Sequence, residues 1–296
     1  MPIPEAQLET WSHQGAMQGS SATYQTIKSA LESPEARYRD KSYEVHLQGS
    51  YCNDTNIFGE SDVDVVMRVD SVFHHDLERL PEAEKEAFAS AHSNATYTWQ
   101  NFKDDVQPQL VDAFGQDVTS GKKAITIAAR GSRRPADVLV ATQFRRYHRF
   151  RSLDDQKYEL GIYFFNGAGQ KITNFPKQHS KNCTVKHQGT GQYFKPVVRI
   201  FKNLRCRLVE EGVLASGIAP SYFIEGLLYN VPDNLFGSSY QDSVVNALNW
   251  LLPADRSELV CANYQFYLLR GDPNVTWSTA HCDAFLKATV DLWEGW

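Results

Sequence analysis

Strand-like and helix-like segments are sorted along this chain rather than interleaved. Up to about residue 175, short runs rich in β-branched residues alternate as half-buried strands do, at residues 43–47, 62–69, 124–128 and 137–141. Beyond that point, helix-like segments separated by glycine and proline follow one another, at residues 193–211, 221–228, 242–251 and 280–292. The length of 296 residues allows two lobes or one large α/β domain, and this change of character favours two lobes. We therefore expect two domains, a strand-containing core at residues 1–175 and a helical lobe at residues 176–296.

Helices are also expected inside the first domain. Residues 6–31 are mostly helix-compatible and end before a proline, so they predict one long helix. Residues 81–93 and 102–114 predict two more, the second ending at Gly115. Residues 130–135 have the length and composition of a hairpin loop between two of the strands. The first domain should therefore combine a sheet with flanking helices.

The composition excludes several classes of protein. The 296 residues are 42% hydrophobic, yet no apolar run approaches the roughly 18 residues of a membrane helix. With 30 basic and 35 acidic residues the net charge is −5, whereas dedicated nucleic-acid binders carry a basic excess. The five cysteines form no C-x-x-C pair, and the first residues lack the pattern of a signal peptide. We expect a cytoplasmic protein with no membrane segment and no obligate nucleic-acid partner.

Two aspartates lie at the start of the second expected strand. Residues two apart in a strand point to the same face, so Asp62 and Asp64 present neighbouring carboxylates while Val63 and Val65 point into the core. Such carboxylates repel each other unless a cation lies between them, and Mg²⁺ prefers oxygen ligands of this kind. Asp137, which opens another strand, supplies a third carboxylate. Three acids that hold two divalent ions, Mg²⁺ or Mn²⁺, suit in-line displacement at phosphorus.

A Gly-Ser turn precedes these aspartates. Gly49 and Ser50 follow the first expected strand, and residues 51–61 separate them from Asp62. Glycine lets the backbone approach a ligand closely, and exposed amides together with the Ser50 hydroxyl suit the β- and γ-phosphates of a nucleotide. Each motif alone also fits an ordinary turn or a solvated strand face. Their order and spacing together predict a nucleotide site.

The motif residues resemble those of a known superfamily. Gly49-Ser50-Tyr51 followed by Gly59-Glu60-Ser61-Asp62-Val63-Asp64-Val65 resembles the signature of the DNA polymerase β-type nucleotidyltransferases. Within this superfamily the chain is similar to the bacterial cGAS/DncV-like enzymes (CD-NTases), which make cyclic oligonucleotide signals in CBASS anti-phage defence. Among these enzymes it resembles clade E most. The resemblance extends over nearly the whole chain and includes Trp11-Ser12-His13-Gln14-Gly15-Ala16, Pro135-Ala136-Asp137-Val138, Lys195-Pro196 to Lys202-Asn203, Pro220-Ser221-Tyr222-Phe223-Ile224-Glu225, Tyr229-Asn230-Val231-Pro232-Asp233 and Leu292-Trp293-Glu294-Gly295-Trp296.

The resemblance implies a fold and a metal site. The fold would be α+β, a DNA polymerase β-like nucleotidyltransferase core and a C-terminal helical lobe that form a two-lobed cage around two nucleotides. Asp62, Asp64 and Asp137 match the metal-binding acids. Asp137 also matches the acid that takes the proton from the attacking hydroxyl, although from chemistry alone it could equally be only a ligand.

The resemblance also implies substrate-binding residues. Lys202 and Ser221 match positions that hold the donor triphosphate, and we expect Gln48 to bind substrate together with Gly49 and Ser50. Without the resemblance, Lys202 stands among three arginines and would be interpreted as part of an ordinary basic helix face.

Asn174 is the candidate for reading the base. Similar clade E enzymes that use pyrimidines carry an asparagine in this segment, whereas purine-using relatives tend to carry a serine. An amide offers both a donor and an acceptor, which suits the edge of uracil. The alternative is that Asn174 caps a turn ahead of Pro176. The resemblance therefore implies a pyrimidine-preferring cyclic dinucleotide synthase that uses UTP and ATP, yields cyclic di-UMP or cyclic UMP-AMP, and signals to a downstream effector.

Other interpretations use the same acids. A synthase restricted to purines, or a nucleotidyltransferase acting on RNA or on a small-molecule or protein acceptor, remains open. An RNA-adding enzyme needs a basic track, and the chain offers one short cluster at residues 145–151. His179, Cys183 and His187 recur every four residues, as zinc ligands on a helix would, but a fourth soft ligand is missing and nearby glycine, asparagine and serine argue against a helix. Structural roles are favoured for these three.

Overall fold

A computed structural model describes residues 2–15, 18–58, 62–121 and 123–296 of the chain. Parts of two quoted motifs, Ala16 and the segment 59–61, lie outside these described residues. Within the described ranges, no helix is both long enough and apolar enough to cross a membrane.

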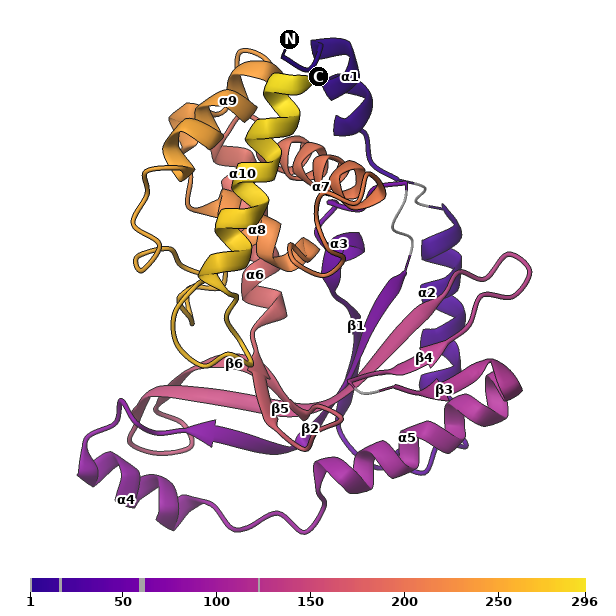
Figure 1. Ribbon diagram of the computed structural model, residues 1–296. Coiled ribbons are helices and arrows are strands. Elements are labelled where there is room, and N and C mark those ends of the chain that lie inside the picture. Colours follow the sequence, from indigo (N-terminus) through magenta and orange to yellow (C-terminus); the bar gives the residue numbers. More distant parts are fainter. Residues whose placement is uncertain (1, 16–17, 59–61, 122) are drawn as a thin grey trace. The chain divides into compact units, whose positions relative to one another are not determined.

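The chain divides into two compact units, whose elements are drawn in Figure 1. The helical unit comprises Met1–Gln18, Gln48–Ser61 and Pro176–Trp296. The strand unit comprises Gly19–Leu47 and Asp62–Phe175. The change from strands to helices at residue 176 coincides with a boundary between the units, and two earlier segments group with the helices. The Gly49-Ser50 turn and the three acids therefore belong to different units.

The described part of the strand unit contains a seven-stranded mixed sheet. Its strands are β1 (Tyr43–Leu47), β2 (Val63–Asp76), β3 (Val118–Ser120), β4 (Ile125–Ile127), β5 (Ala136–Phe150), β6 (Gln156–Phe165) and β7 (Lys171–Asn174). The order is β1-β2-β5-β4-β3, and β6 pairs with both β5 and β7. β2 and β5 run parallel, because the chain between them crosses over through helices, whereas the other pairs are antiparallel. The expected hairpin at residues 130–135 joins β4 to β5 and is confirmed.

In the described part of the strand unit, the sheet is flanked by α2 (Gln18–Leu31), α4 (Glu82–Ala91) and α5 (Trp99–Phe114). Phe102, Val106 and Leu110 recur every four residues on one face of α5 and are fully buried in the core of the unit. Alternate residues of β2, beginning with Val63 and Val65, enter the same core. The expected helices at 81–93 and 102–114 are confirmed, and a capping box at Thr98 moves the start of the second to Trp99.

The helical unit gathers the remaining helices around α7. They are α1 (Glu5–Ser12), α3 (Gly49–Cys52), α6 (Pro176–Gly189), α7 (Phe194–Glu210), α8 (Ser221–Tyr229), α9 (Tyr240–Leu251) and α10 (Thr279–Gly295), with a short 3-10 turn at Asp233–Leu235. A second short 3-10 turn, Gly115–Asp117, follows α5 in the strand unit. α7 buries apolar residues along most of its length, including Phe194, Val198 and Phe201. The four helices expected after residue 176 are confirmed. Their cores merge into one apolar cluster that also takes in Ile3 and Leu8.

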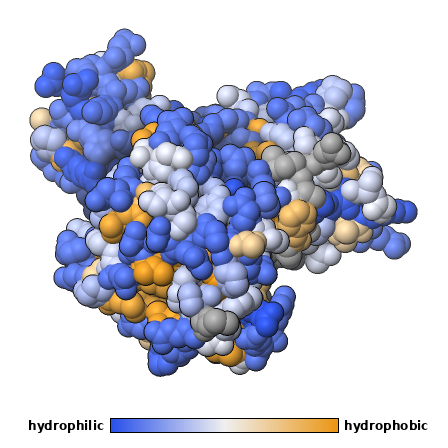
Figure 2. All heavy atoms as spheres, turned by 90° about the horizontal axis from the view of Figure 1, so that it is seen from above, coloured by the Kyte–Doolittle hydropathy of each residue, from blue (hydrophilic) through white to orange (hydrophobic). Residues whose placement is uncertain are grey.

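An apolar patch lies on this unit beside the chain's N-terminal residues. A hollow of about 480 Å³ is lined by Pro2, Val245, Leu248, Asn249, Leu252, Val290, Trp293 and Glu294. Figure 2 looks onto this end of the helices and shows apolar side chains gathered on a largely hydrophilic face. None of the candidate site residues lines this hollow.

The expectation of one long helix at residues 6–31 is wrong. α1 ends at Ser12 and α2 begins at Gln18. Between them the Gly15 amide donates to the Asn56 carbonyl at 3.0 Å, and a Cβ at Gly15 would lie 2.7 Å from the Ile57 carbonyl carbon. The chain leaves the helix to pack against residues 56–57, a contact for which only glycine is small enough.

Candidate active site

Asp64 and Asp137 are register partners on the parallel strands β2 and β5. Partners in a parallel ladder lie on the same face, and neighbouring strands are about 4.8 Å apart. Both aspartates are half-buried, and the residues on either side of each are buried, so the alternation predicted from the sequence is present. Asp62 immediately precedes β2 and is exposed. The strand unit thus brings the predicted acids to one edge of the β2–β5 ladder.

Thr126 on β4 fixes one of these acids. It is the register partner of Asp137 across the β4–β5 hairpin, and its Oγ1 donates to Asp137 Oδ1 at 2.8 Å. This contact orients the Asp137 carboxylate. Thr126 is not among the residues predicted from the sequence, although the expected hairpin pairs its strand with that of Asp137.

The donor set suits a hard divalent cation. Three carboxylates provide oxygen ligands, and Mg²⁺ binds such oxygens while keeping some of its water. The adjacent positions of Asp64 and Asp137 therefore fit the metal ions that the sequence implies.

Gln48, Gly49 and Ser50 lie where the chain enters α3 in the helical unit. Gly49 has φ +69°, a left-handed conformation that favours glycine, and Gln48 precedes it in extended backbone. The Ser50 carbonyl accepts a 2.9 Å hydrogen bond from the Thr55 amide. The predicted phosphate turn is thus tied to the segment that follows it.

Lys202 lies in the core rather than at the surface. Its side chain is fully buried, and its Nζ donates to the Thr55 carbonyl at 2.9 Å. Lys195 and Arg199, on the same face of α7, donate to the side chain and the carbonyl of Asp54. This basic face of α7 therefore holds residues 54–55. The contact of Lys202 with a triphosphate stays a prediction.

Ser221 and Asn174 occupy the ends of two elements. Ser221 is the first residue of α8 and follows Pro220. Asn174 ends β7, and its Oδ1 accepts a 2.8 Å hydrogen bond from the Phe175 amide. This is the turn contact that the sequence analysis offered as the alternative to base reading. An amide has two oxygen lone pairs and two N–H donors, so a turn contact and a base contact are compatible.

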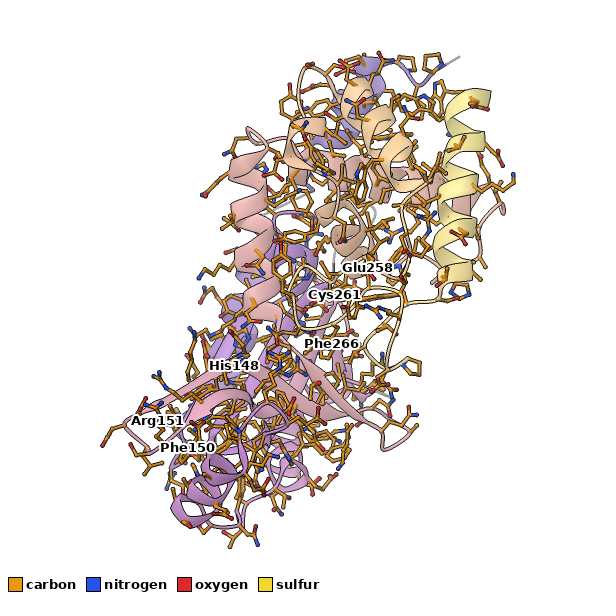
Figure 3. The ribbon with its side chains drawn as sticks, turned by 90° about the vertical axis from the view of Figure 1, so that its left-hand side faces the viewer. His148, Phe150, Arg151, Glu258, Cys261 and Phe266 are labelled. Atoms are coloured by element: carbon orange, nitrogen blue, oxygen red, sulfur yellow. The ribbon has the colours of Figure 1, made fainter. Side chains whose placement is uncertain are left out.

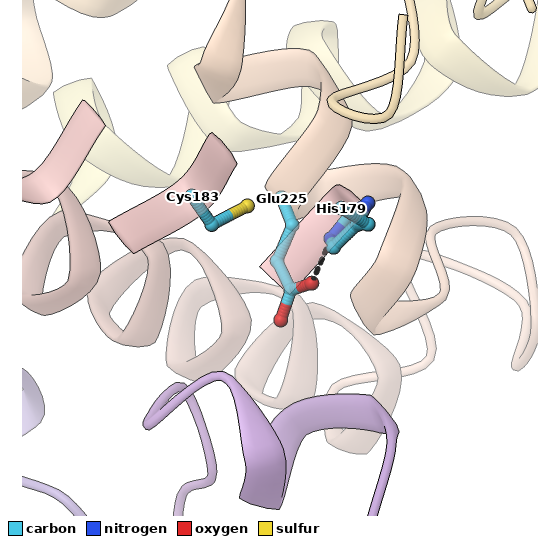
Figure 4. A group of neighbouring side chains, drawn as sticks. All are labelled: His179, Cys183 and Glu225. Carbon is cyan, nitrogen blue, oxygen red and sulfur yellow. Dashed lines mark hydrogen bonds and ion pairs between the residues drawn. The ribbon is translucent and has the colours of Figure 1, made fainter. Parts of the chain in front are cut away.

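His179 and Cys183 lie on α6, which is helical contrary to the expectation from its composition. The third member of their cluster is Glu225 of α8 rather than His187 (Figure 4). His179 Nε2 and Glu225 Oε2 are 2.6 Å apart, a hydrogen-bond distance, whereas ligand atoms around tetrahedral zinc are roughly 3.3 Å apart. The geometry is that of a buried hydrogen-bonded pair, in agreement with the structural role favoured from the sequence.

Glu225 is the buried acid of this network. Burial by itself raises the pKa of its carboxyl, but the hydrogen bond and charge of His179, with Thr55 and Lys202, outweigh that effect and hold the pKa below its usual value. The carboxyl is therefore ionised at neutral pH.

The arginine cluster at residues 145–151 is compensated by its neighbours. Arg145 stacks over Phe73 at 4.0 Å, and Arg146 Nε lies 3.0 Å from a carboxylate oxygen of Asp76. The pairs Arg149–Asp155 and Arg151–Asp155 continue this pattern at the end of β5, where Figure 3 labels His148, Phe150 and Arg151. Acids and rings therefore balance much of the positive charge here.

A wide groove lies at the far end of β2 from Asp64. It measures about 1450 Å³, and its lining includes residues 71–75 of β2, residues 92–100, and residues 165–167. Asp62, Asp64 and Asp137 do not line it, so the groove and the acids are separate features of the strand unit.

The chain is similar to known proteins along its whole length. Residues 181–294 match the family described as cGAS/DncV-like nucleotidyltransferase C-terminal helical domain. The chain is 40% identical to "Cyclic UMP-AMP synthase" of Rhodothermus marinus (100% of this chain, 99% of that protein) and 36% identical to "Cyclic nucleotide synthase CdnE01" of Staphylococcus haemolyticus (100% of both). It is also 32% identical to "Cyclic dipurine nucleotide synthase" of Elizabethkingia meningoseptica (84% of both).

The solved structures agree. The Rhodothermus marinus CdnE c-UMP-AMP synthase, solved with Apcpp and Upnpp, superposes with a TM-score of 0.89 over 100% of this chain and 98% of that one. The α+β nucleotidyltransferase fold with a C-terminal helical domain, expected from the sequence, is confirmed. The chain therefore belongs to the cGAS/DncV-like nucleotidyltransferases (CD-NTases), in their CdnE clade, and is a cyclic dinucleotide synthase.

Proposed function

We propose that this enzyme prefers UTP in at least one of its two nucleotide positions and makes cyclic UMP-AMP or cyclic di-UMP. The observation that carries the proposal is Asn174 at the end of β7, in a chain 40% identical to an enzyme named for cyclic UMP-AMP. The amide can donate to and accept from the uracil edge. A purine-only product is the second candidate, because a relative 32% identical is named for dipurine products.

The acids of the strand unit are proposed to serve the chemistry. Asp62, Asp64 and Asp137 would supply oxygen ligands to two Mg²⁺ ions, with Mn²⁺ as a substitute. Such ions neutralise triphosphate charge and stabilise both the attacking and the leaving oxygen of an in-line displacement.

Asp137 is proposed to take the proton from the attacking ribose hydroxyl. Its carboxylate is oriented by Thr126, so one geometry serves each turnover. The hydroxyl oxygen attacks the α-phosphorus of the second nucleotide, and pyrophosphate leaves with the electrons of the broken P–O bond. A second attack, within the linear dinucleotide, closes the ring and releases the second pyrophosphate.

The helical unit is proposed to hold the donor triphosphate. The amides and hydroxyl of Gly49 and Ser50, with Gln48 beside them, would contact its phosphates, and so would the Ser221 hydroxyl at the start of α8. Lys202 would add positive charge beneath this turn through its bond to Thr55. None of these contacts reads a base, so they set affinity rather than product identity.

The product is proposed to act as a second messenger in anti-phage defence, by activating an effector that binds cyclic nucleotides. In vitro, the purified protein is incubated with labelled ATP, GTP, CTP and UTP and Mg²⁺ or Mn²⁺, and products that resist nuclease and phosphatase are identified by mass. We expect a uracil-containing cyclic dinucleotide. Products built from purines alone would contradict the base preference, and extension of added RNA would favour a different nucleotidyltransferase.

A further inference from the structure

Glu225 is a fully satisfied buried carboxylate that the proposed chemistry does not use. It is 1% exposed and accepts hydrogen bonds from Thr55 Oγ1 and, at 2.9 Å, from Asn53 Nδ2. His179 pairs with the same carboxylate and stacks on Tyr222 with ring centroids 3.9 Å apart. A buried charge is costly unless it is paired, and a complete network of this kind fixes its members in one geometry.

The partners of Glu225 lie directly behind the phosphate turn. The Thr55 hydroxyl has one hydrogen, which it donates to Glu225. The Ser50 carbonyl then accepts its hydrogen bond from the Thr55 backbone N–H. Asn53, whose side chain donates to Glu225, also donates its backbone N–H to the Gly49 carbonyl at 3.1 Å. Two short hydrogen-bond paths therefore run from the Glu225 carboxylate to the carbonyls of Gly49 and Ser50.

The α7 cations hold the same segment through other atoms. Lys202 donates to the Thr55 carbonyl, and Lys195 Nζ lies 2.8 Å from an Asp54 carboxylate oxygen. Asp54 has φ +54°, a conformation that non-glycine residues adopt at a cost and keep only when surrounding contacts enforce it. Residues 53–55 are thus clamped between the carboxylate of α8 and the ammonium groups of α7.

We propose that Glu225 is a positioning residue for the donor triphosphate. It acts through Asn53 and Thr55, whose hydrogen bonds fix the Gly49 and Ser50 carbonyls and hence the amides and hydroxyl that contact phosphate. The inference rests on the proposed role of the Gly49-Ser50 turn. A small misplacement of the binding groups weakens every contact that they make. Loss of the network should therefore lower the affinity for the triphosphate more than the affinity for the nucleoside.

The test compares two ligands on folded variants of the full chain. The probes are a UTP analogue with nitrogen bridging the α- and β-phosphates, bound in the presence of Mg²⁺, and uridine, together with the corresponding adenosine pair. Thr55→Val keeps the shape of the side chain but removes the hydroxyl, Thr55→Ser keeps the hydroxyl, and Glu225→Gln removes the charge. Ser243→Ala is the matched control, because its buried hydroxyl bonds only to residues 237 and 239 within the described chain.

We expect Thr55→Val and Glu225→Gln to weaken triphosphate binding about tenfold or more, as loss of a hydrogen bond to a charged group would, and to change nucleoside binding less than about twofold. Thr55→Ser should restore triphosphate affinity. Ser243→Ala should lower the melting temperature without changing the ratio of the two affinities. If Glu225→Gln does not fold, the two Thr55 variants decide the question alone.

Unchanged triphosphate affinity in Thr55→Val, equal losses for triphosphate and nucleoside, or the same selective loss in Ser243→Ala would each overturn the inference. A wild-type protein that binds the triphosphate but makes no uracil-containing product contradicts the proposed function and leaves this inference standing. A wild-type protein that binds triphosphate no better than nucleoside contradicts both.

Discussion

Asp64 and Asp137 lie side by side as register partners on the parallel strands β2 and β5, and each has buried residues before and after it in its strand. The register puts the two carboxylates on one face of the sheet, and Thr126 holds one oxygen of Asp137. A rigid ladder of this kind keeps the charge of the pair in place whether or not substrate is bound. Charge at this edge should therefore matter far more for turnover than for folding.

Asp62→Asn combined with Asp64→Asn should abolish synthesis while leaving the fold intact. The amides keep the side-chain volume but remove two anionic ligands, and we expect activity to fall at least about 100-fold. Product formation and a thermal melt check both parts. Asp112→Asn, on the exposed face of α5, is the control. Near wild-type turnover in the double variant would mean that these acids do not bind the metal.

Lys202→Ala should weaken triphosphate binding and lower stability together. Lys202 is fully buried, and its removal leaves the Thr55 carbonyl without this donor and takes positive charge away from Glu225. Loss of a buried hydrogen bond from a charged donor costs roughly 1.5–3 kcal/mol. Urea unfolding and nucleotide titration measure the two effects, with exposed Lys181→Ala as control. Since the contact reads no base, a changed product ratio at unchanged affinity would disprove this role.

Asn174→Ser should shift the products from uracil towards adenine and guanine. Serine is shorter and lacks the amide donors, so the uracil contact is lost and a larger base gains room. A base contact of this kind contributes about 1–3 kcal/mol, or roughly a 10- to 100-fold preference. Equimolar nucleotide competition followed by mass analysis gives the ratio, and Asn94→Ser at an exposed position serves as control. An unchanged ratio would contradict the base-reading role of Asn174 and favour its role in the turn before Phe175.

The pH dependence of stability should contain a contribution from His187. Burial, and then the charges of Lys195 and Arg199, lower the pKa of His187 from 6.5 to about 4, against an opposing effect of Asp54. The unfolded chain therefore binds a proton below about pH 6.5 that the folded chain binds only near pH 4. The free energy of unfolding should be highest above this window, fall as the pH drops through it, and level off below it.

Urea unfolding at half-unit steps of pH measures this effect. His187→Gln should flatten the profile between the two pKa values, because glutamine does not titrate there. His281→Gln, an exposed change on α10, is the comparison. Glu225 affects the free energy of unfolding at lower pH. Its pKa in the folded chain lies below the ordinary value, so the stability that the ionised carboxylate adds is lost as the pH falls and the carboxyl becomes protonated. An unchanged slope in His187→Gln would show that His187 has the same pKa in the folded and unfolded chains.

Local patterns in the sequence determined most of the elements and the acids. Alternation with period two predicted that the side chains of Asp62 and Asp64 point to the face opposite that of Val63. The turn at residues 130–135 predicted the β4–β5 hairpin, in which Asp137 lies near the start of β5. These features depend on neighbours within a few residues, which a single sequence displays directly. The resemblance of the motifs to a known family added the role of the acids, and the comparisons confirmed the family.

Only the tertiary structure decided which distant polar groups meet. The periodicity of α7 shows that Lys195, Arg199 and Lys202 share a face, but a basic face on a helix usually points to solvent, and here it is buried against residues 54–55. The contact of Thr55 with Glu225 spans 170 positions. No local sequence pattern predicts this contact, because long-range packing decides which groups are buried together. A buried charge must be paired with a partner, whereas the same residue on the surface would be solvated by water.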